Sequence, residues 1–597
     1  MLETTRGPLV GRTEELGRLT SLLAEAAAGR PVVTLISGDA GVGKTRLVTE
    51  LAARAREQGF AVLSGRCAEL GDAVPYLPLA DALRDATTGP SAGGPLLDAL
   101  AARPVLSRLL PDRDDSQPAG GDLPGLVQQQ LFGAVLGMLA ELTAASPVLL
   151  ILEDLHWADR STRDLVTFLS RVLHSERLAV VVTYRSDDLH RRHPLRPVIT
   201  ELLRLPSVSA IELGPLAASA MAEHLMTLAR QPLDAAAIGQ MITRAEGNAY
   251  YAEELLAASS AGTGSAGTGS AGTGSAGAVS AGAVSANAVS GGTELPAGLA
   301  ELLLARMERL SGPAQQVLKA AAVTGRRVDD ELVMLASGLA EPVYDDAVRE
   351  AVAHQLLVPD GAQGYWFRHA LLREAVYADL LPGERTRLHA RLAELLADER
   401  RLAEAPGTAA ELAHHCLASH DIPGAFAASV LAGQEAERLA APTEAHRHYD
   451  QALSLWERVP DPEKLGGLER GKLALRSALS AADGGDVARA AAQLRGLLGF
   501  LAAGSGTGTG VGTGTGADPV LVCRANERLA YFLMDIDEEA AALAAAQTAV
   551  DALPADPPRW ERARALATHA RASLTLPGPG RAGTGGRQGG EGTLGGG

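Results

Sequence analysis

The chain has 597 residues, 46% of them hydrophobic but only 3% aromatic, and carries a formal net charge of −17 at pH 7. This length suits about three to five domains, and a core built from Ala, Leu and Val favours helices. The acidic balance argues against a nucleic-acid surface over the whole chain, and no apolar run or leader predicts membrane insertion or export. Three widely spaced cysteines without metal-binding spacing fit a reducing cytoplasm.

The first predicted domain, residues 8–213, alternates short apolar runs with helical patterns. Such alternation predicts an α/β fold with a parallel sheet and crossover helices, in which ligands bind at the carboxyl ends of the strands. The predicted strands are Val32–Ile36, Ala61–Ser64, Val148–Leu152, Ala179–Thr183 and Ser209–Leu213.

A complete phosphate-binding loop follows the first predicted strand. Residues 38–45 read Gly-Asp-Ala-Gly-Val-Gly-Lys-Thr, which is the G-x-x-x-x-G-K-[ST] pattern of a P-loop, and a helical pattern comes directly after them. Glycines let backbone N–H groups wrap a phosphate, and the N-terminus of the next helix favours the same negative charge. Lys44 would reach the β- and γ-phosphates, and the Thr45 hydroxyl would bind Mg²⁺. The alternative is a Gly-rich turn without a ligand, which this context disfavours.

Two further predicted strands end in charged residues that would lie near the P-loop. Val148–Leu152 is followed by Glu153 and Asp154, and the predicted strand at Ala179–Thr183 is followed by Tyr184 and Arg185. We predict that Glu153 serves the metal ion and that Asp154 orients or deprotonates the attacking water. Arg185 would reach the γ-phosphate, and the alternative is a surface arginine that closes a strand.

The remaining chain is predicted to be mostly helical, interrupted by low-complexity stretches. A short β-ribbon is expected around Leu356–Phe367, and the small–large–small face of Ala445, Tyr449 and Ala452 suggests tetratricopeptide-like repeats, with an ordinary helical bundle as the alternative. The predicted segments are a helical lid at 214–257, a disordered linker at 258–294, a mainly helical module at 295–390, repeats at 391–502, a disordered linker at 503–517, further repeats at 518–577 and a disordered Gly-rich tail at 578–597.

Several motifs together resemble a known family. They are residues 9–16, the P-loop, Leu-Leu-Ile-Leu-Glu-Asp-Leu-His-Trp-Ala-Asp at 149–159, Thr-Tyr-Arg at 183–185, Gly-Asn-Ala-Tyr-Tyr-Ala-Glu-Glu-Leu at 247–255, Phe-Arg-His-Ala-Leu-Leu-Arg-Glu-Ala-Val-Tyr at 367–377 and Glu-Leu-Ala-His-His at 411–415. Over about residues 8–500, excluding the predicted linkers, the chain is similar to large ATP-binding regulators of the LuxR type. These are signal-transducing ATPases with numerous domains, and their ATPase domain is related to Orc1-like AAA ATPases.

The resemblance implies a nucleotide switch that uses ATP, ADP and Mg²⁺ and hydrolyses ATP slowly. ADP would hold the ATPase domain, the lid and a winged-helix module at 295–390 closed, whereas ATP and an unknown inducer or protein bound to the repeats would open them for homo-oligomerisation. Val10 and Arg12 would border the adenine pocket, and Arg185 would sense the γ-phosphate. His369 would approach the ADP phosphates, with a purely structural histidine as the alternative. The phosphate-side residues would be Gly38, Gly41, Val42, Gly43, Lys44, Thr45 and Arg46.

The chain also departs from the family pattern. The family often has Pro where this chain has Ala249, and no LuxR-type helix-turn-helix is recognisable after the repeats, so the chain is expected to be a fragment or to act without that DNA reader. The same region resembles the non-catalytic part of soluble adenylyl cyclases, and an Orc1-like DNA-binding ATPase is a further alternative. We expect no sequence-specific DNA binding, because the helix predicted at Asp329–Leu339 carries acids but no Lys or Arg.

Overall fold

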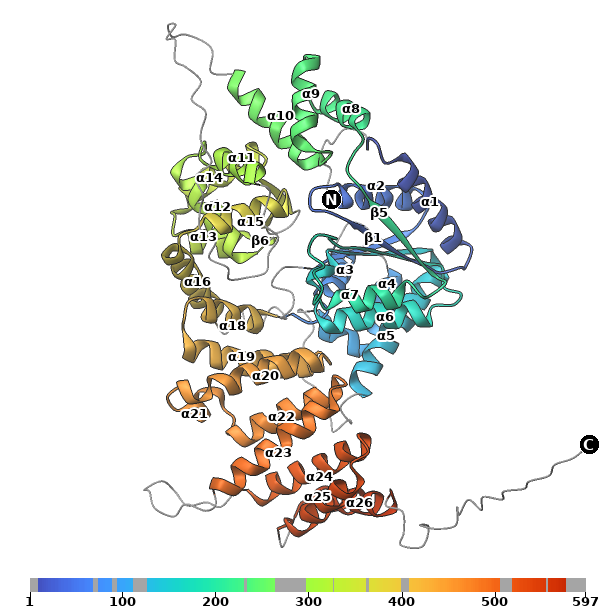
Figure 1. Ribbon diagram of the computed structural model, residues 1–597, viewed down its shortest axis with the longest axis vertical. Helices are drawn as coiled ribbons and strands as arrows, with labels where there is room; N and C mark the ends of the chain where they lie inside the picture. Colours follow the sequence, from blue (N-terminus) through green and yellow to red (C-terminus); the bar gives the residue numbers. More distant parts are fainter. Residues whose placement is uncertain are drawn as a thin grey trace, which may run out of the picture. The chain divides into compact units, whose positions relative to one another are not determined.

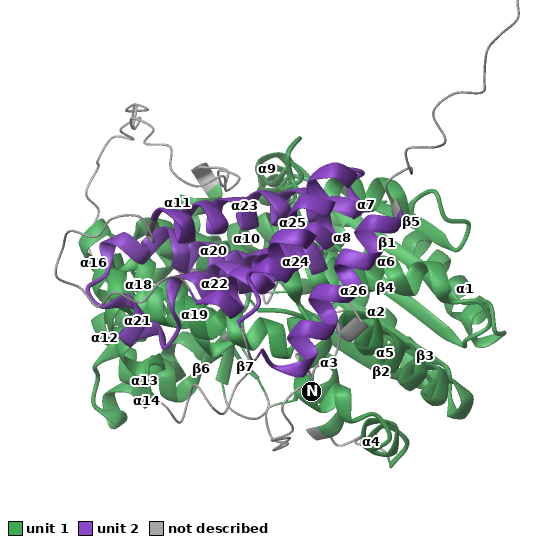
Figure 2. Ribbon diagram, turned by 90° about the horizontal axis from the view of Figure 1, so that it is seen from below, with its two compact units in different colours: residues 1–444 green, residues 445–597 purple. Residues whose placement is uncertain are grey.

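The computed structural model describes residues 9–67, 74–88, 94–110, 126–229, 233–263, 297–325, 327–360, 364–398, 407–504, 518–554 and 557–575. Its contacts divide the chain into two compact units, residues 1–444 and 445–597, which Figure 2 colours separately. The predicted tail at 578–597 and most of the two predicted linkers lie outside the described residues. One boundary is corrected: helix α10 (Ala249–Thr263) continues past residue 257 into the start of the predicted linker, where it adds further turns to a helix already formed.

A five-stranded parallel sheet forms the centre of the N-terminal part of the first unit, in the order β2-β3-β4-β1-β5. Figure 1 labels β1 and β5 of this sheet. Its strands are β1 (Val32–Gly38), β2 (Ala61–Arg66), β3 (Val148–Glu153), β4 (Leu178–Thr183) and β5 (Val208–Leu213). Every residue of β3 and β4 is buried, as expected for inner strands of a parallel sheet. The predicted α/β fold with a parallel sheet is confirmed, and each predicted strand ends within two residues of its observed limits.

Helices pack against this sheet through leucine-rich faces. Leu19 of α1 and Leu47 and Leu51 of α2 share one buried cluster with Ile36 and Leu149 of the sheet. The helices of this part are α1 (Thr13–Ala27), α2 (Lys44–Glu57), α3 (Leu77–Thr88), α4 (Gly94–Ala101), α5 (Leu126–Ala145), α6 (Arg160–Val172) and α7 (Leu195–Leu202), with 3₁₀ turns η2 (Pro104–Leu109) and η3 (Leu155–Trp157). The parallel register brings the carboxyl ends of β1, β3 and β4 to one edge, where the P-loop begins.

Three helices follow β5 and correspond to the predicted lid. They are α8 (Ala218–Leu228), α9 (Ala235–Ala245) and α10, and Leu216, Met221, Leu225 and Met241 form their shared core. The next helix, α11 (Ala297–Met307), packs on α10, so the lid is continuous with the module that follows it.

That module combines helices with a small antiparallel sheet in the order β6-β8-β7. Its elements are α11, α12 (Gly312–Thr324), β6 (Arg327–Asp329), α13 (Asp330–Ser337), α14 (Glu341–Ala353), β7 (Leu357–Asp360), β8 (Gly364–Phe367), α15 (Ala370–Asp379) and α16 (Pro382–Leu396). The predicted ribbon around Leu356–Phe367 is present as β7 and β8. The assignment of this region as a winged helix stays a prediction.

Helices alone make up the rest of the described chain. The first unit continues with α18 (Thr408–Ala418), α19 (Ile422–Arg438) and the start of α20 (Pro442–Leu455). The second unit continues through η4 (Trp456–Arg458), α21 (Pro462–Gly466), α22 (Arg470–Asp483), α23 (Val487–Gly504), α24 (Pro519–Asp535), α25 (Glu539–Asp551) and α26 (Arg559–Thr575). Ala445, Tyr449 and Ala452 are fully buried, as their spacing predicted, while the repeat class stays a prediction.

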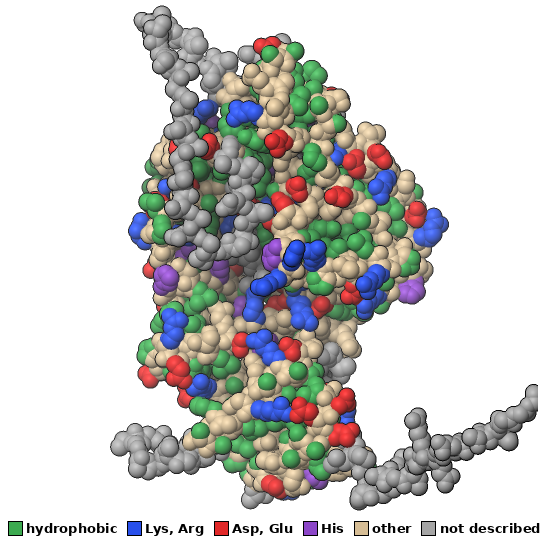
Figure 3. Space-filling view, viewed as in Figure 1, with side chains coloured by type: hydrophobic (Ala, Val, Ile, Leu, Met, Phe, Trp, Pro, Cys, Tyr) green, Lys and Arg blue, Asp and Glu red, His purple; other side chains and the backbone are tan. Residues whose placement is uncertain are grey.

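Among the described residues, no helix combines the length and apolarity needed to cross a membrane. On the face drawn in Figure 3, acidic and basic side chains are interspersed over most of the surface, with one group of Lys and Arg side chains near the centre of the view. This face is therefore not a uniformly basic one of the kind that DNA-binding domains present.

Candidate functional site

The P-loop connects β1 to α2 in a conformation that its glycines permit. Gly38, Gly41 and Gly43 have φ values of 152°, 80° and 108°, and α2 begins at Lys44 immediately after them. The Lys44 ammonium is buried and donates hydrogen bonds to the carbonyls of Gly38 (2.6 Å) and Asp39 (2.9 Å). The lysine is thus held at the start of the helix, where phosphates bind in P-loop proteins.

Burial makes the charge of Lys44 costly. It lowers the pKa of Lys44 to about 8, although the carboxylate of Asp154 favours the charged form. A buried cation of this kind is poised to be neutralised by an anionic ligand, because a phosphate would offset the cost of desolvation.

The lid packs directly on the P-loop. Asn248 donates a hydrogen bond from Nδ2 to the carbonyl of Ala40 (2.8 Å), and the backbone N–H of Tyr250 donates to the carbonyl of Gly41 (3.2 Å). A Cβ added to Gly41 would lie 2.7 Å from Asn248 Oδ1, so only glycine fits at this contact. The loop that would wrap a phosphate is therefore braced by the start of α10.

The two acidic residues after β3 have different surroundings. Glu153 is buried and forms an ion pair with Arg66 (2.7 Å), and it does not line the cavity beside the P-loop. Asp154 lines that cavity and has a left-handed backbone conformation with φ 60°, which turns its side chain away from the direction of the strand. Its backbone N–H donates to the hydroxyl of Thr183 (3.0 Å). The structure thus brings Asp154, rather than Glu153, to the side of Lys44 and Thr45.

Arg185 follows β4 and reaches into the same cavity. Its guanidinium pairs with Glu374 of α15 (2.9 Å), lies 3.6 Å from Asp188, and stacks over the ring of Trp157 at 4.9 Å. The adjacent His156 is buried, which lowers its pKa to about 3, so this imidazole is neutral at physiological pH. The ion pair with Glu374 ties Arg185 to α15, which lies outside the sheet.

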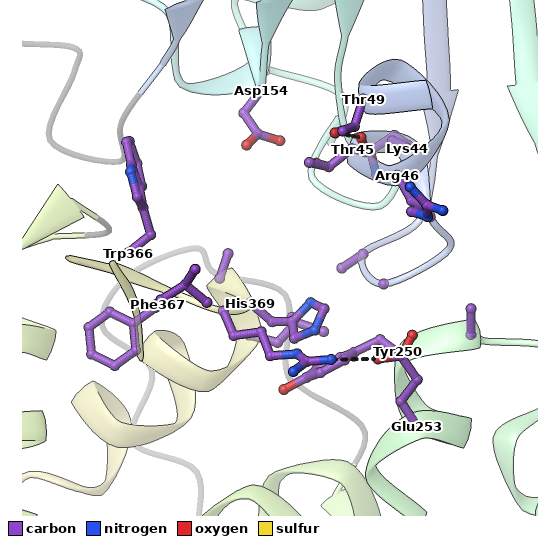
Figure 4. A pocket seen from close by; sticks show the side chains of 18 of the residues that line it. Lys44, Thr45, Arg46, Thr49, Asp154, Tyr250, Glu253, Trp366, Phe367 and His369 are labelled. Carbon is purple, nitrogen blue, oxygen red and sulfur yellow. Dashed lines mark hydrogen bonds and ion pairs between the residues drawn. The ribbon is translucent and has the colours of Figure 1, made fainter. Parts of the chain in front are cut away.

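The cavity itself has a volume of about 250 Å³ and is lined by three parts of the first unit. Figure 4 shows Lys44, Thr45 and Asp154 on one side and Tyr250, Trp366 and His369 facing them. Val10 and Arg46, both predicted to contact nucleotide, also line it, and so does Arg185. The lining residues come from the part that holds the parallel sheet, from the lid and from the stretch that runs from β7 through β8 to the start of α15.

Contacts between the lid and the β8–α15 segment close one side of the cavity. The ring centroids of Tyr250 and His369 lie 3.7 Å apart, and Nη2 of Arg368 lies 3.5 Å from Oε2 of Glu253. Burial alone would raise the pKa of Glu253, but the imidazole of His224, whose Nε2 lies 3.3 Å from the carboxylate, and the nearby His369 and Arg368 hold it at about 2. His369 is therefore at the cavity, as predicted, and it is stacked on a tyrosine.

Other predicted residues lie beside the cavity but do not line it. Arg12 is buried and donates to the carbonyls of Val42 (3.2 Å) and Gly214 (2.6 Å), so it ties the N-terminal segment to the P-loop and to the end of β5. Val42 is part of the core under the loop. Gly38 contributes the turn at the end of β1. These three residues support the loop in this structure.

The sequence patterns assign no role to Arg66, Tyr250, Glu374 or Trp366. Arg66 ends β2 just as Arg185 follows β4, so the same signal, a cation at the carboxyl edge of a parallel sheet, would have found it. Its guanidinium lies 5.1 Å from the ring centroid of Trp366 and pairs with Glu153. Tyr250 and Trp366 carried no local signal, because a single aromatic residue is more often part of a core.

A second buried acidic site lies at the start of α6, shortly after the acidic pair. Asp159 accepts a hydrogen bond from the backbone N–H of Thr162 (2.8 Å), and Glu444 accepts from the backbone N–H of Arg160 (2.8 Å) and from the hydroxyl of Ser161 (2.6 Å). Burial, with the neighbouring charge of Glu444, raises the pKa of Asp159 to about 8. Asp159 therefore holds a proton near neutral pH.

We predict that this pair makes the protein less stable as the pH rises. The folded protein binds a proton that the unfolded chain releases near pH ~4, so stability falls as the pH rises from there through the raised pKa of Asp159. Glu444→Gln removes the second charge and should flatten the change in melting temperature between mildly acidic and mildly alkaline buffer. Differential scanning fluorimetry of both proteins measures this, and an unchanged slope in Glu444→Gln would show that other groups cause it.

Comparisons with known proteins agree with the geometry of the first part of the chain. Residues 8–182 match the family model of the AAA ATPase domain. The chain is 27% identical over 492 residues to uncharacterized protein R02095 of Rhizobium meliloti (strain 1021), and the match covers 78% of this chain and 44% of that protein. The chain thus spans less than half the length of this relative.

Among solved structures, one similar protein is a signal transduction ATPase with numerous domains and a tetratricopeptide repeat sensor from Pyrococcus horikoshii, at 11% identity and TM-score 0.42, covering 96% of this chain and 75% of that one. Another is a Drosophila ORC bound to DNA, at 13% identity and TM-score 0.28, covering 63% and 88%. These scores are too low to carry an argument about function. The match of residues 8–182 to the family model shows that the chain contains an AAA ATPase domain. This domain includes the P-loop and the acidic pair at the end of β3.

Proposed function

We propose that the chain is an ATP-binding switch with slow ATPase activity. One observation carries this proposal: the cavity at the P-loop is lined both by the ATPase part and by the β8–α15 segment of the module at 297–396. A nucleotide bound there would touch both parts, so its phosphates would decide whether they stay together.

The residues present suit a magnesium nucleotide. The P-loop backbone, Lys44 and the N-terminus of α2 offer donors and positive charge for phosphate oxygens, while the Thr45 hydroxyl and the Asp154 carboxylate offer oxygen ligands for Mg²⁺ or its waters. A bound Mg²⁺ ion would supply charge neutralisation at the β- and γ-phosphates. Val10 and Tyr250 would border the remainder of the nucleotide, and Lys44 would hold the phosphates against α2.

Arg185 is the proposed link between the phosphates and the module. In this structure its guanidinium is engaged by Glu374 of α15. A γ-phosphate would compete with that carboxylate for the same guanidinium, whereas ADP would leave the ion pair intact. His369, stacked on Tyr250 at the cavity, would add a second contact that favours the closed arrangement with ADP.

We further propose that the switch belongs to a LuxR-type transcriptional regulator. The motifs that resemble this family and the run of helices from α18 to α26 support the proposal, with the helices sensing an inducer or a protein partner. ATP binding would then allow homo-oligomerisation, while sequence-specific DNA binding would not be a property of residues 1–597 themselves.

The test is nucleotide binding and assembly by the full chain. Isothermal titration calorimetry with Mg²⁺ should show saturable binding of both ATP and ADP, and light scattering should show a larger particle with a non-hydrolysable ATP analogue than with ADP. If neither nucleotide binds, the proposal is wrong. If both bind but the mass is the same, the chain is an ATPase without the proposed switch.

The two carboxylates after β3 are predicted to have separable roles. Asp154→Asn should slow hydrolysis by about 10²–10⁴-fold while ATP still binds, because an amide cannot accept a proton from water. Glu153→Gln removes the charge that pairs with Arg66 outside the cavity, so it should affect Mg²⁺-dependent binding only through the position of Asp154 and should impair hydrolysis less than Asp154→Asn does. Single-turnover hydrolysis and calorimetry distinguish the two, and the same defect in both variants would contradict the division of roles.

A further inference from the structure

Three histidines outside the nucleotide cavity converge between helices α16 and α18. His389 comes from α16, and His414 and His415 are consecutive residues of α18. One nitrogen atom from each ring lies within 4.8 Å of the other two, and the Nδ1 atoms of His389 and His415 are 2.7 Å apart. His389 and His415 are buried, whereas His414 is exposed.

We propose that His389, His414 and His415 bind one divalent transition-metal ion of the zinc class. Imidazole nitrogens are preferred ligands of Zn²⁺, Co²⁺ and Ni²⁺, and three protein ligands leave a fourth position for water on the exposed side of His414. With metal–nitrogen distances of about 2.0–2.1 Å, tetrahedral ligand atoms lie about 3.3 Å apart. Small ring rotations from the observed separations would reach this geometry.

The phenol ring of Tyr377 next to the cluster provides the kind of hydrogen-bond partner that orients metal-binding histidines. Nε2 of His389 lies 3.1 Å from the hydroxyl of Tyr377, so that nitrogen can donate its hydrogen to the phenol oxygen while Nδ1 faces the cluster. A partner of this type fixes the ring and leaves the lone pair on the ligand nitrogen.

The simpler reading is a hydrogen bond between two histidines. Such a bond requires only His389 and His415 and gives no reason for the third nitrogen of His414 within the same few ångströms. Positive charge nearby limits the affinity for a metal: Arg373 donates to the carbonyl of Ala322 and Arg385 to that of Tyr377, both close to the cluster. The site should therefore bind metal more weakly than an all-cysteine structural zinc site does.

The position of the site gives it a structural consequence. The helices α16 and α18 pack against each other, and α16 belongs to the module at 297–396 whereas α18 begins the following helices. A metal ion held by both helices would stabilise that junction, because binding to the folded state adds to its free energy of unfolding.

Cobalt provides a direct probe. The full chain, treated with chelator and free of nucleotide, is titrated with Co²⁺, whose visible d–d absorption is strong in tetrahedral and weak in octahedral sites. We expect one equivalent to bind with tetrahedral absorption, to be displaced by Zn²⁺, and to raise the melting temperature. Absence of saturable absorption in the wild type would overturn the proposal.

Variants then test the three ligands. His414→Ala alters an exposed side chain and should preserve the fold, yet it should weaken Co²⁺ binding at least about tenfold. Tyr377→Phe should weaken binding to a smaller extent. The matched control is His420→Asn, an exposed histidine close to α18 but outside the cluster, where binding should be unchanged. Wild-type affinity in His414→Ala would overturn the three-histidine site, even if a His389 variant failed to fold.

Discussion

Replacing Lys44 by methionine should lower the affinity for magnesium ATP by about ten- to a hundredfold while leaving the ligand-free protein no less stable than the wild type. The lost contacts are charge-assisted hydrogen bonds to phosphate, which contribute roughly 1.5–3 kcal/mol. Methionine keeps the aliphatic stem of the side chain but removes the buried ammonium. In this structure that ammonium donates hydrogen bonds to the backbone carbonyls of Gly38 and Asp39.

The stability part of this prediction follows from the pKa of Lys44. Burial lowers that pKa to about 8, while an unfolded lysine titrates near ~10.4, so between these values the unfolded chain binds the extra proton. The folded protein therefore gains stability as the pH rises through this window and carries a cost of up to about 3 kcal/mol at neutral pH. The lowered pKa already includes the attraction to Asp154, so Lys44→Met removes this net cost.

Calorimetric titration and thermal unfolding of the same samples measure both effects. Lys472→Ala is the matched control, since Lys472 is an exposed lysine of α22 that pairs with Glu469 of the same turn. It should change neither nucleotide affinity nor, by more than a few tenths of a kcal/mol, stability. Unchanged ATP affinity in Lys44→Met would mean that the P-loop does not bind the nucleotide.

The parts of the fold that could be predicted from the sequence are those encoded locally. Val148–Leu152 is a continuous apolar run, which is typical of a strand buried on both faces, and the P-loop has a fixed spacing between such a strand and a helix. The strand positions and the start of α2 followed from these patterns. The strand order β2-β3-β4-β1-β5 did not, because it depends on how separate segments pair.

The contacts that define the cavity could not be predicted, because they join residues far apart in sequence. Arg185 and Glu374 are 189 positions apart, and Arg66 and Glu153 are 87 apart. The position of Glu153 at the end of a strand therefore suggested a metal ligand. In the structure its carboxylate pairs with Arg66 of the neighbouring strand. The three histidines between α16 and α18 were missed for the same reason, since residues 389, 414 and 415 do not have the spacing of a metal motif.

Removing the charge of Glu374 should favour ATP over ADP. The ion pair between Arg185 and Glu374 is largely shielded from solvent, with 7% and 22% of the two side chains exposed, and Glu374→Gln replaces it with a weaker hydrogen bond of similar shape. Arg185 would then be freer to contact a γ-phosphate, while ADP, which lacks that phosphate, gains nothing. Couplings of this kind amount to about 1–3 kcal/mol, so the ratio of ATP to ADP affinity should rise by about 5- to 150-fold.

Arg185→Gln should have the opposite effect. It should lower the ratio of ATP to ADP affinity, because the side chain that would contact the γ-phosphate loses its charge. In the double variant the Glu374→Gln change should have no further effect, because its action passes through Arg185. Asp379→Asn is the control, an exposed acidic residue on the same helix α15. Competition titrations of ATP and ADP on the wild type and the four variants decide the matter. If Glu374→Gln changes both affinities equally, the ion pair is a structural contact between α15 and the ATPase part, and Arg185 does not distinguish the two nucleotides.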